Sequence, residues 1–173
     1  SYKKPPLIIA KISSNNNGNK NRFLNLIREA CKCNADLIKI QTYEPDDITL
    51  KIKNNFFKIK KGIWKGKYLY DLYKTACTPY SWHKEAFNIV KKYNKIIFSS
   101  PFSQKGVDFL ENLNVPLYKL ASFEITDFRL IDYIASKKKP IIISTGMASL
   151  DEIDKAIKII EKYHQKIIIL HCV

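Results

Sequence analysis

The sequence is poor in glycine, arginine and cysteine. It has 5 glycines in 173 residues, and of its 30 basic residues only Arg22, Arg28 and Arg129 are arginines. No G-x-G-x-x-G or G-x-x-x-x-G-K-[ST] motif occurs, which argues against a glycine-rich phosphate loop. The 4 cysteines are too few for a disulfide framework in a chain of this length, so a cytoplasmic location is expected. No apolar run approaches the roughly 20 residues of a membrane span.

The charge of the chain is strongly positive but comes almost entirely from lysine. The formal net charge is +14 at pH 7. Sites that read nucleic acids favour arginine, whose planar group grips phosphates and guanine edges with two hydrogen bonds. We therefore expect a solvated basic surface, with no nucleic-acid or membrane partner. Such a field would still attract an anionic small molecule.

Short apolar runs rich in β-branched residues recur along the chain and predict strands. They begin 22–29 residues apart, except for one interval of 59 residues. The six runs are Leu7–Ile12, Asp36–Ile40, Lys95–Phe98, Leu117–Leu120, Pro140–Ile143 and Lys166–Leu170. Helical patterns lie between them, most clearly at Ser149–Tyr163, which opens with a capping box formed by Ser149 and Glu152. Thr78 followed by Pro79 predicts another helix start, with Thr78 as the N-cap.

Alternating strands and helices predict an α/β fold with a parallel sheet. The regular spacing favours a (β/α)8 barrel of the TIM type, truncated after the sixth parallel strand, because eight units need roughly 250 residues. An open doubly wound sheet is the alternative, although the first turn lacks its usual glycines. We expect residues 1–173 to form a single incomplete barrel domain. The long interval indicates an insertion at about 43–77, after the second strand.

Polar residues follow every predicted strand, at the end where parallel α/β folds collect their reacting groups. Two lysines, Lys39 and Lys119, lie within otherwise apolar strands, which is costly unless each meets an anion. On the second strand, Lys39 shares a face with Gln41 because side chains alternate. Lys39 and Lys119 are expected to point inward and meet, with serine and threonine hydroxyls between them. Such a ring of ammonium groups and hydroxyls suits a phosphate and a carboxylate. Alternatively, both lysines extend to solvent at the strand ends.

Several of these segments resemble signatures of the sialic acid synthase family. They are Lys39-Ile-Gln-Thr, Ser99-Ser-Pro-Phe-Ser103, Tyr118-Lys-Leu-Ala-Ser122 and Ile143-Ser-Thr-Gly-Met147. Further segments resemble its pseudaminic acid synthase branch more closely: Lys61-Gly-Ile-Trp64, Leu69-Tyr-Asp-Leu-Tyr73, Thr78-Pro79 with Trp82-His83, and Ala121-Ser-Phe-Glu-Ile-Thr126. The resemblance runs nearly end to end. Each segment is weak evidence alone, but their order and spacing are specific.

The resemblance implies a barrel enzyme that joins phosphoenolpyruvate to a six-carbon acetamido sugar, releasing phosphate and forming a nine-carbon acidic sugar. It implies that Asn15 and Gln41 lie near the sugar. It further implies a divalent metal, Mn²⁺ or Mg²⁺, that activates the sugar aldehyde, and a homodimer of the full-length protein. The residues that it assigns to phosphoenolpyruvate are Lys39, Ser100, Lys119, Ser122 and Ser144.

The sequence departs from the family pattern after its first strand, where Ser14 also replaces a usual glycine and only Asn15 matches. Lys11 and Asn16 stand where the family usually has glutamate and histidine, which leaves the catalytic residues unknown. The metal-binding histidines of the family lie on later strands, so this chain contains none of the metal ligands. His83 is expected to be structural, His164 ends a surface helix, and His171, the remaining histidine, makes a poor divalent site by itself. Cys172 is expected to be a packed thiol, because no histidine–acid pair supports it as a nucleophile.

Four functional interpretations remain open from the sequence. The first is the N-terminal portion of a phosphoenolpyruvate-dependent nonulosonic acid synthase. The second is a degenerate remnant that binds anions without turnover, which Lys11 and Asn16 favour. The third is a single-strand nucleic-acid-binding module that uses the basic, aromatic segment 51–73. The fourth is an aldolase in which Lys119 forms a Schiff base.

Overall fold

The computed structural model describes residues 5–172 and contains all six predicted strands, which alternate with helices. Its internal contacts divide the chain into two compact units, of which unit 1 ends at Lys95 and unit 2 begins at Ile96. Each unit is built from parallel strands and the helices that follow them. Within the described residues no helix is both long enough and apolar enough to cross a bilayer. The expectation of one domain over residues 1–173 stays a prediction.

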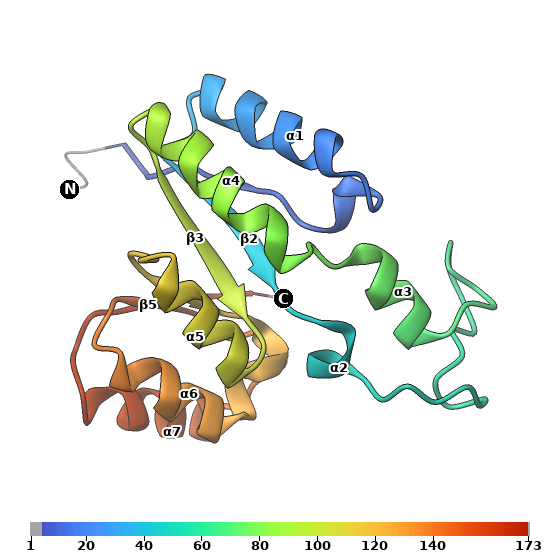
Figure 1. The fold of residues 1–173 in the computed structure, drawn as a ribbon. Helices are drawn as coiled ribbons and strands as arrows, with labels where there is room; N and C mark the ends of the chain where they lie inside the picture. Colours follow the sequence, from blue (N-terminus) through green and yellow to red (C-terminus); the bar gives the residue numbers. More distant parts are fainter. Residues whose placement is uncertain (1–4, 173) are drawn as a thin grey trace. The chain divides into compact units, whose positions relative to one another are not determined.

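Unit 1 holds two strands, a short 3₁₀ helix and four α-helices. These are β1 (Ile9–Lys11), η1 (Ser14–Asn16), α1 (Lys20–Lys32), β2 (Leu37–Thr42), α2 (Pro45–Ile48), α3 (Leu69–Ala76) and α4 (Tyr80–Lys92). The strands β1 and β2 pair in parallel. Helices α1 and α4 lie side by side (Figure 1), with the rings of Phe23 and Trp82 5.8 Å apart.

The side chains of β2 alternate between two environments, as the sequence predicts. Ile38 and Ile40 are fully buried, whereas Lys39 and Gln41 are partly exposed on the other face. The region that follows β2 holds α2, α3 and an isolated antiparallel bridge between Lys58 and Tyr68. These elements lie within the predicted insertion at 43–77.

The N-terminus of α4 lies one residue later than the sequence predicts. The helix begins at Tyr80 with Pro79 as its N-cap, and no side chain caps it. The hydroxyl of Thr78 instead accepts a hydrogen bond from the amide of Asn16, at 3.4 Å. Thr78 is buried, so its hydroxyl serves a contact between distant parts of unit 1 rather than the local helix.

Unit 2 is a four-stranded parallel sheet in which the strands are adjacent in chain order. Helices α5, α6 and α7 lie side by side in Figure 1. The elements are β3 (Ile96–Pro101), α5 (Gln104–Asn112), β4 (Tyr118–Leu120), η2 (Ser122–Thr126), α6 (Phe128–Ser136), β5 (Ile141–Ser144), α7 (Leu150–Glu161) and β6 (Ile167–Leu170).

The core of unit 2 is formed by apolar side chains of the strands and of the helices. Phe98, Leu120 and Ile143 on the strands are completely buried, as are Leu110 and Ile160 on the helices. Burying each such side chain contributes about 1.5–3 kcal/mol. The predicted capping box of α7 is confirmed, since Ser149 and Glu152 satisfy each other's backbone N–H groups.

The strand β6 is the exposed edge of unit 2. Ile168 and Ile169 are each about half exposed, at 54% and 50%. In contrast, the neighbouring strand β5 is buried along its whole length. Within the described residues no strand pairs with the free side of β6.

Lys119 and its neighbour Tyr118 point to opposite faces of β4, and the face with Tyr118 packs against α5. Tyr118 is completely buried and its hydroxyl donates a hydrogen bond to the carboxylate of Glu111. Burial and the nearby Glu111 raise the pKa of the Tyr118 hydroxyl well above its usual range. Lys139 forms an ion pair with the same carboxylate at 2.6 Å. Because neighbouring residues of a strand point to opposite faces, the Tyr118 side chain fixes the direction of Lys119.

Candidate functional site

The register of unit 2 places several polar residues on one face of its sheet. Ser99 pairs with Tyr118, so Ser100 is level with Lys119 on the adjoining strand. Lys119 is in turn level with Ile142, two residues before Ser144. Side chains two residues apart share a face, and residues level with each other on adjacent strands do too. Ser100, Lys119 and Ser144 therefore line the face of the sheet opposite Tyr118.

Lys119 is the buried charge of this face. Its side chain is only 8% exposed, and its Nζ donates to the hydroxyl of Ser144 and to the carbonyl of Leu120, the latter at 3.0 Å. A buried ammonium is stable only when its donors are used and a negative charge or dipoles compensate it. Lys119 thus brings a positive charge and a neighbouring hydroxyl to the carboxyl ends of β4 and β5.

Ser100 supplies a hydroxyl that is left without a partner. The residue is completely buried, and within residues 5–172 its Oγ has no hydrogen-bond partner. Unpaired buried polar groups are rare and costly, so they mark places that a water molecule or a ligand completes. Its register puts this hydroxyl on the same face as Lys119.

Three chain segments meet closely at the ends of β4, β5 and β6. A Cβ atom added to Gly146 would lie 2.9 Å from the Oγ of Ser122 and 3.4 Å from the Cβ of Cys172. Only glycine leaves room for Ser122 to approach the backbone here. Met147, the next residue, has a φ of +64°, a left-handed conformation that is uncommon outside glycine. Ser122 and Cys172 are therefore brought beside the end of β5.

Cys172 is not the packed thiol that the sequence suggested. Its side chain is partly exposed, and its Sγ lies 3.7 Å from the carbonyl oxygen of Leu170. Hydrogen bonds from Ser144 and Ser122, together with the charge of Lys119, lower the pKa of the thiol. The same groups that favour a negative sulfur would favour another small anion at this place.

Glu124 is a residue of this region that the sequence reading did not single out. It lies in η2, directly after β4, and burial raises the pKa of its carboxyl, while the nearby Lys119 partly opposes that rise. Its Oε2 is buried without a hydrogen-bond partner in the described part of the chain. The sequence feature that could have drawn attention to Glu124 is its position in the segment Ala121-Ser-Phe-Glu-Ile-Thr126, which begins where β4 ends.

The polar residues at the strand ends of unit 1 have a different character. Lys11 is level with Lys39 on the adjacent strand, as the shared register of β1 and β2 requires. Ser13 donates a hydrogen bond to the side-chain oxygen of Gln41 at 2.5 Å. This unit thus places two cations and one paired amide on the face that Lys39 and Gln41 share. The predicted meeting of Lys39 with Lys119, which lies in unit 2, stays a prediction.

Asn15 and Asn16 occupy contrasting environments in the turn after β1. Asn15 is exposed, and its carbonyl accepts a hydrogen bond from the Nε of Arg22 at 2.9 Å. Asn16 is fully buried, with its side-chain oxygen accepting from the backbone N–H of Gly18 at 2.8 Å and its amide donating to Thr78. The buried asparagine therefore shapes the turn, while Asn15 is the one that faces solvent.

His83 has the structural role that the sequence predicts. It is completely buried, its Nδ1 lies 3.1 Å from the carbonyl of Pro79 and its Nε2 lies 2.8 Å from the hydroxyl of Thr42. The carbonyl requires a proton on Nδ1, so Nε2 accepts from the threonine. Burial lowers the pKa of His83 to about 4. The ring is therefore a neutral link between α4 and the end of β2.

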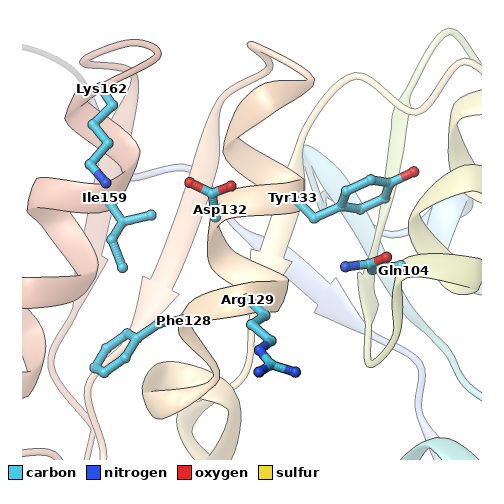
Figure 2. Close-up of a pocket in the computed structure, with 7 residues that line it drawn as sticks. All are labelled: Gln104, Phe128, Arg129, Asp132, Tyr133, Ile159 and Lys162. Atoms are coloured by element: carbon cyan, nitrogen blue, oxygen red, sulfur yellow. The ribbon is translucent and has the colours of Figure 1, made fainter.

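Pockets occur in both units. In unit 2 a small pocket of about 150 Å³ lies between the loops after β4 and β5 and reaches Ser122 and Gly146. A larger one, of about 460 Å³, lies on helices α5, α6 and α7; Figure 2 shows the side chains of Phe128, Arg129 and Asp132 there. In unit 1 a pocket of about 410 Å³ is lined by Tyr43, Tyr70 and Tyr80 together with acidic residues. The small pocket is the one at the strand ends of unit 2, where ligands of parallel α/β folds bind.

A metal ion has no complete set of ligands in this part of the chain. Within residues 5–172 no group of three or more His, Cys, Asp and Glu side chains is placed to hold one. A divalent metal of the kind that the resemblance implies would need ligands from elsewhere. What the described residues do offer is a buried ammonium group beside hydroxyls, a combination whose chemistry favours anions.

The architecture is that of a (β/α) barrel that stops after its sixth strand. The chain superimposes on an N-acetylneuraminic acid synthetase from Leptospira borgpetersenii, whose structure contains citrate, with a TM-score of 0.84 and 28% identity. The match covers 98% of this chain and 55% of that protein. The predicted fold class is thereby confirmed.

The sequence comparisons agree with the fold. The model of the NeuB family matches residues 26–173. The chain is 41% identical over 170 residues to the pseudaminic acid synthase of Helicobacter pylori, covering 98% of this chain and 50% of that protein. It is 35% identical over 173 residues to the N,N'-diacetyllegionaminic acid synthase of Campylobacter jejuni, covering 98% and 52%. The chain belongs to the NeuB family, and it spans about half the length of the curated relatives it matches.

Proposed function

We propose that this chain is the N-terminal portion of a sugar acid synthase and supplies its phosphoenolpyruvate-binding residues. The complete enzyme condenses phosphoenolpyruvate with a six-carbon acetamido sugar, forms an acidic nine-carbon sugar and releases phosphate. The relatives named for pseudaminic and diacetyllegionaminic acid synthesis support this class of product. The related synthetase that was crystallised with citrate shows that a relative accommodates a small polycarboxylate.

The observation that carries the proposal is the cluster around Lys119. A buried ammonium donates to the Ser144 hydroxyl, and the Ser100 hydroxyl, which has no partner in the described part of the chain, lies on the same face. Phosphoenolpyruvate carries a phosphate and a carboxylate, so it needs both fixed positive charge and directed donors. Lys119 and the serines hold and orient it, with Ser122 beside the end of β5. The family resemblance assigns Lys39 to the same substrate.

The second substrate is assigned to unit 1. Asn15 is exposed in the turn after β1, and Gln41 lies at the end of β2. Amide groups donate to and accept from sugar hydroxyls without adding charge. A divalent metal, when bound, would polarise the sugar aldehyde, and its ligands would come from outside residues 5–172. We further propose that the full-length enzyme is a homodimer in the cytoplasm.

Phosphate release by the full-length protein tests this function. With phosphoenolpyruvate, an acetamido hexose and Mn²⁺, the wild-type protein should release phosphate, and Lys119→Ala should lower kcat/KM by about 10²–10³-fold, as loss of a charged donor does. Lys155→Ala, which removes an exposed lysine of α7, is the matched control and should retain activity. A full-length wild-type protein that releases no phosphate with any acetamido hexose would refute the proposal.

A second candidate function is a degenerate relative that binds anions without turnover. It is favoured by the register of Lys11, which places its charge beside Lys39, where like charges oppose each other. The buried Asn16, whose amide is engaged by Thr78 and Gly18, also replaces a histidine expected from the resemblance. If this lesion is real, full-length Lys11→Glu combined with Asn16→His should gain phosphate release that the unaltered protein lacks.

A further inference from the structure

Cys172 shares the polar face of unit 2 with the residues assigned to phosphoenolpyruvate. Leu170 is level with Ser144, and Cys172 lies two residues further along the same chain segment. The Cβ of Cys172 comes within 3.4 Å of the position that a Gly146 Cβ would occupy, and the Oγ of Ser122 comes within 2.9 Å of the same position. The thiol therefore lies at the edge of the polar cluster formed by Lys119, Ser122 and Ser144.

The surroundings of Cys172 differ from those of the other cysteines. Hydrogen bonds from Ser144 and Ser122 and the charge of Lys119 lower the pKa of its thiol. In contrast, burial raises the pKa of Cys31 and of Cys77. Thiolates are the nucleophilic form of cysteine, and cysteines that react are partly exposed and lie near positive charge. Cys172 meets both conditions.

A second observation points to a ligand at this face independently of the thiol. The Ser100 hydroxyl is completely buried, has no partner within residues 5–172 and lies level with Lys119. A small anion held by Lys119 and these hydroxyls would give Ser100 its partner. The same anion would lie close to Cys172, because Lys119 donates to Ser144, which is level with Leu170 two residues before the thiol, and because Cys172 and Ser122 both approach Gly146.

We propose that Cys172 is a covalent modification site for small carboxylate-bearing electrophiles, which the anion-binding face directs to its sulfur. The inference deepens the proposed function and rests on it for the identity of the ligand that protects the thiol. With iodoacetate, the thiolate sulfur attacks the methylene carbon, a carbon–sulfur bond forms, and iodide leaves with the electron pair of the carbon–iodine bond. The product is a carboxymethyl thioether whose carboxylate stays near Lys119.

The test compares iodoacetate with its neutral counterpart, iodoacetamide, on the full-length protein. The rate of modification is followed at each cysteine by mass spectrometry. For Cys172 the ratio of the iodoacetate rate to the iodoacetamide rate should exceed the ratio for the exposed Cys33 by about fivefold or more, because fixed positive charge concentrates anions. Unfolding in urea should remove this difference. Phosphoenolpyruvate or inorganic phosphate should slow modification of Cys172 and leave Cys33 unaffected.

Two variants separate charge steering from simple exposure. Lys119→Met should bring the rate ratio of Cys172 down to that of Cys33, whereas Lys155→Met on the surface of α7 should preserve it. Equal rate ratios at Cys172 and Cys33 in the wild-type protein would overturn the proposal, whether or not the enzyme releases phosphate. Preferential carboxymethylation without protection by phosphate or phosphoenolpyruvate would also overturn it. Preference with protection, in a protein that releases no phosphate, would support the modification site and refute only the proposed function.

Discussion

The two units use the same structural position, the carboxyl ends of parallel strands, for different chemistry. In unit 2 the polar face gathers Lys119 with serine hydroxyls, and that of Ser100 has no hydrogen-bond partner among residues 5–172. In unit 1, Ser13 is bonded to Gln41, Asn16 to Thr78, and Thr42 to His83. Unit 2 therefore combines a buried ammonium with a serine hydroxyl open to a ligand, whereas unit 1 combines two more exposed lysines, Lys11 and Lys39, with neutral groups that are bonded to one another. The difference teaches that the same position at the strand ends can carry different chemistry: a buried charge with hydroxyls in unit 2, and amides with exposed cations in unit 1.

The largest expected effect is a loss of stability of unit 1 at low pH, which tests the hydrogen bonds of the neutral His83. The pKa of His83 is about 4 in the folded protein against 6.5 for a free histidine, so below pH 6.5 the unfolded chain binds the extra proton. The free energy of unfolding of unit 1 should fall as the pH drops from 6.5 to 4, by on the order of 3 kcal/mol. Hydrogen exchange of the α4 amides, followed by mass spectrometry, measures it.

A variant without the titrating ring provides the control for this pH dependence. His83→Gln should be less stable at pH 7 and should lose most of the slope between pH 6.5 and 4. His164→Gln removes a histidine beyond the end of α7, in unit 2, and should leave the slope at α4 unchanged. An unaltered slope in His83→Gln would show that another group titrates in unit 1.

The next largest effect is on the KM values, and it distinguishes a residue assigned to phosphoenolpyruvate from one assigned to the sugar. Ser100→Ala removes a buried hydroxyl without a partner, so the folded protein should be as stable as wild type or more stable. The KM for phosphoenolpyruvate should nevertheless rise about tenfold, the equivalent of one hydrogen bond of about 1.4 kcal/mol. Gln41→Ala should instead raise the KM for the sugar. Steady-state kinetics with each substrate varied measure the split.

The assignment of separate substrates to Ser100 and Gln41 would be wrong if both variants had the same kinetic effect. If Ser100→Ala and Gln41→Ala change both KM values alike, Ser100 and Gln41 do not bind separate substrates. A marked loss of stability in Ser100→Ala, measured by urea unfolding, would show that the hydroxyl already has a partner in solution.

The smallest effect concerns the close approach at Gly146. A methyl group at this position would meet the Ser122 hydroxyl at 2.9 Å, so Ser122 must shift. Gly146→Ala should cost about 1 kcal/mol of unfolding free energy, in the lower part of the range for overpacking. In a Ser122→Ala background the cost should fall, because the contacting oxygen is gone. Equal costs in the two backgrounds would mean that the strain lies elsewhere.

The strands were predictable because their signals are local. Buried parallel strands are apolar on both faces, and the runs that contain Ile38, Phe98 and Ile143 each gave a strand in the structure. The placement of Lys119 on a strand next to hydroxyl-bearing loops followed from the same runs. The family resemblance then named the correct family, since ordered short segments over the whole chain carry more information than any one of them.

What the sequence did not reveal depends on contacts between distant segments. The shift at Thr78 arises because its hydroxyl meets Asn16, 62 positions away, instead of capping α4. The partial exposure of Cys172 depends on how β6 ends beside Gly146. Glu124 is distinguished by burial near Lys119, which no local pattern indicates. Register and burial are properties of the assembled sheet, so these features depend on the tertiary structure.

The hydrogen bond from Tyr118 to Glu111, with Lys139 on the same carboxylate, has a consequence for how this family diversifies. A change on the outer side of the sheet would rotate β4 slightly and redirect its ammonium group. If the proposed anion binds at Lys119, substitutions on the Tyr118 side of the sheet can change its affinity without meeting a substrate. An inhibitor that contacts only the Lys119 side would leave those positions free to evolve resistance.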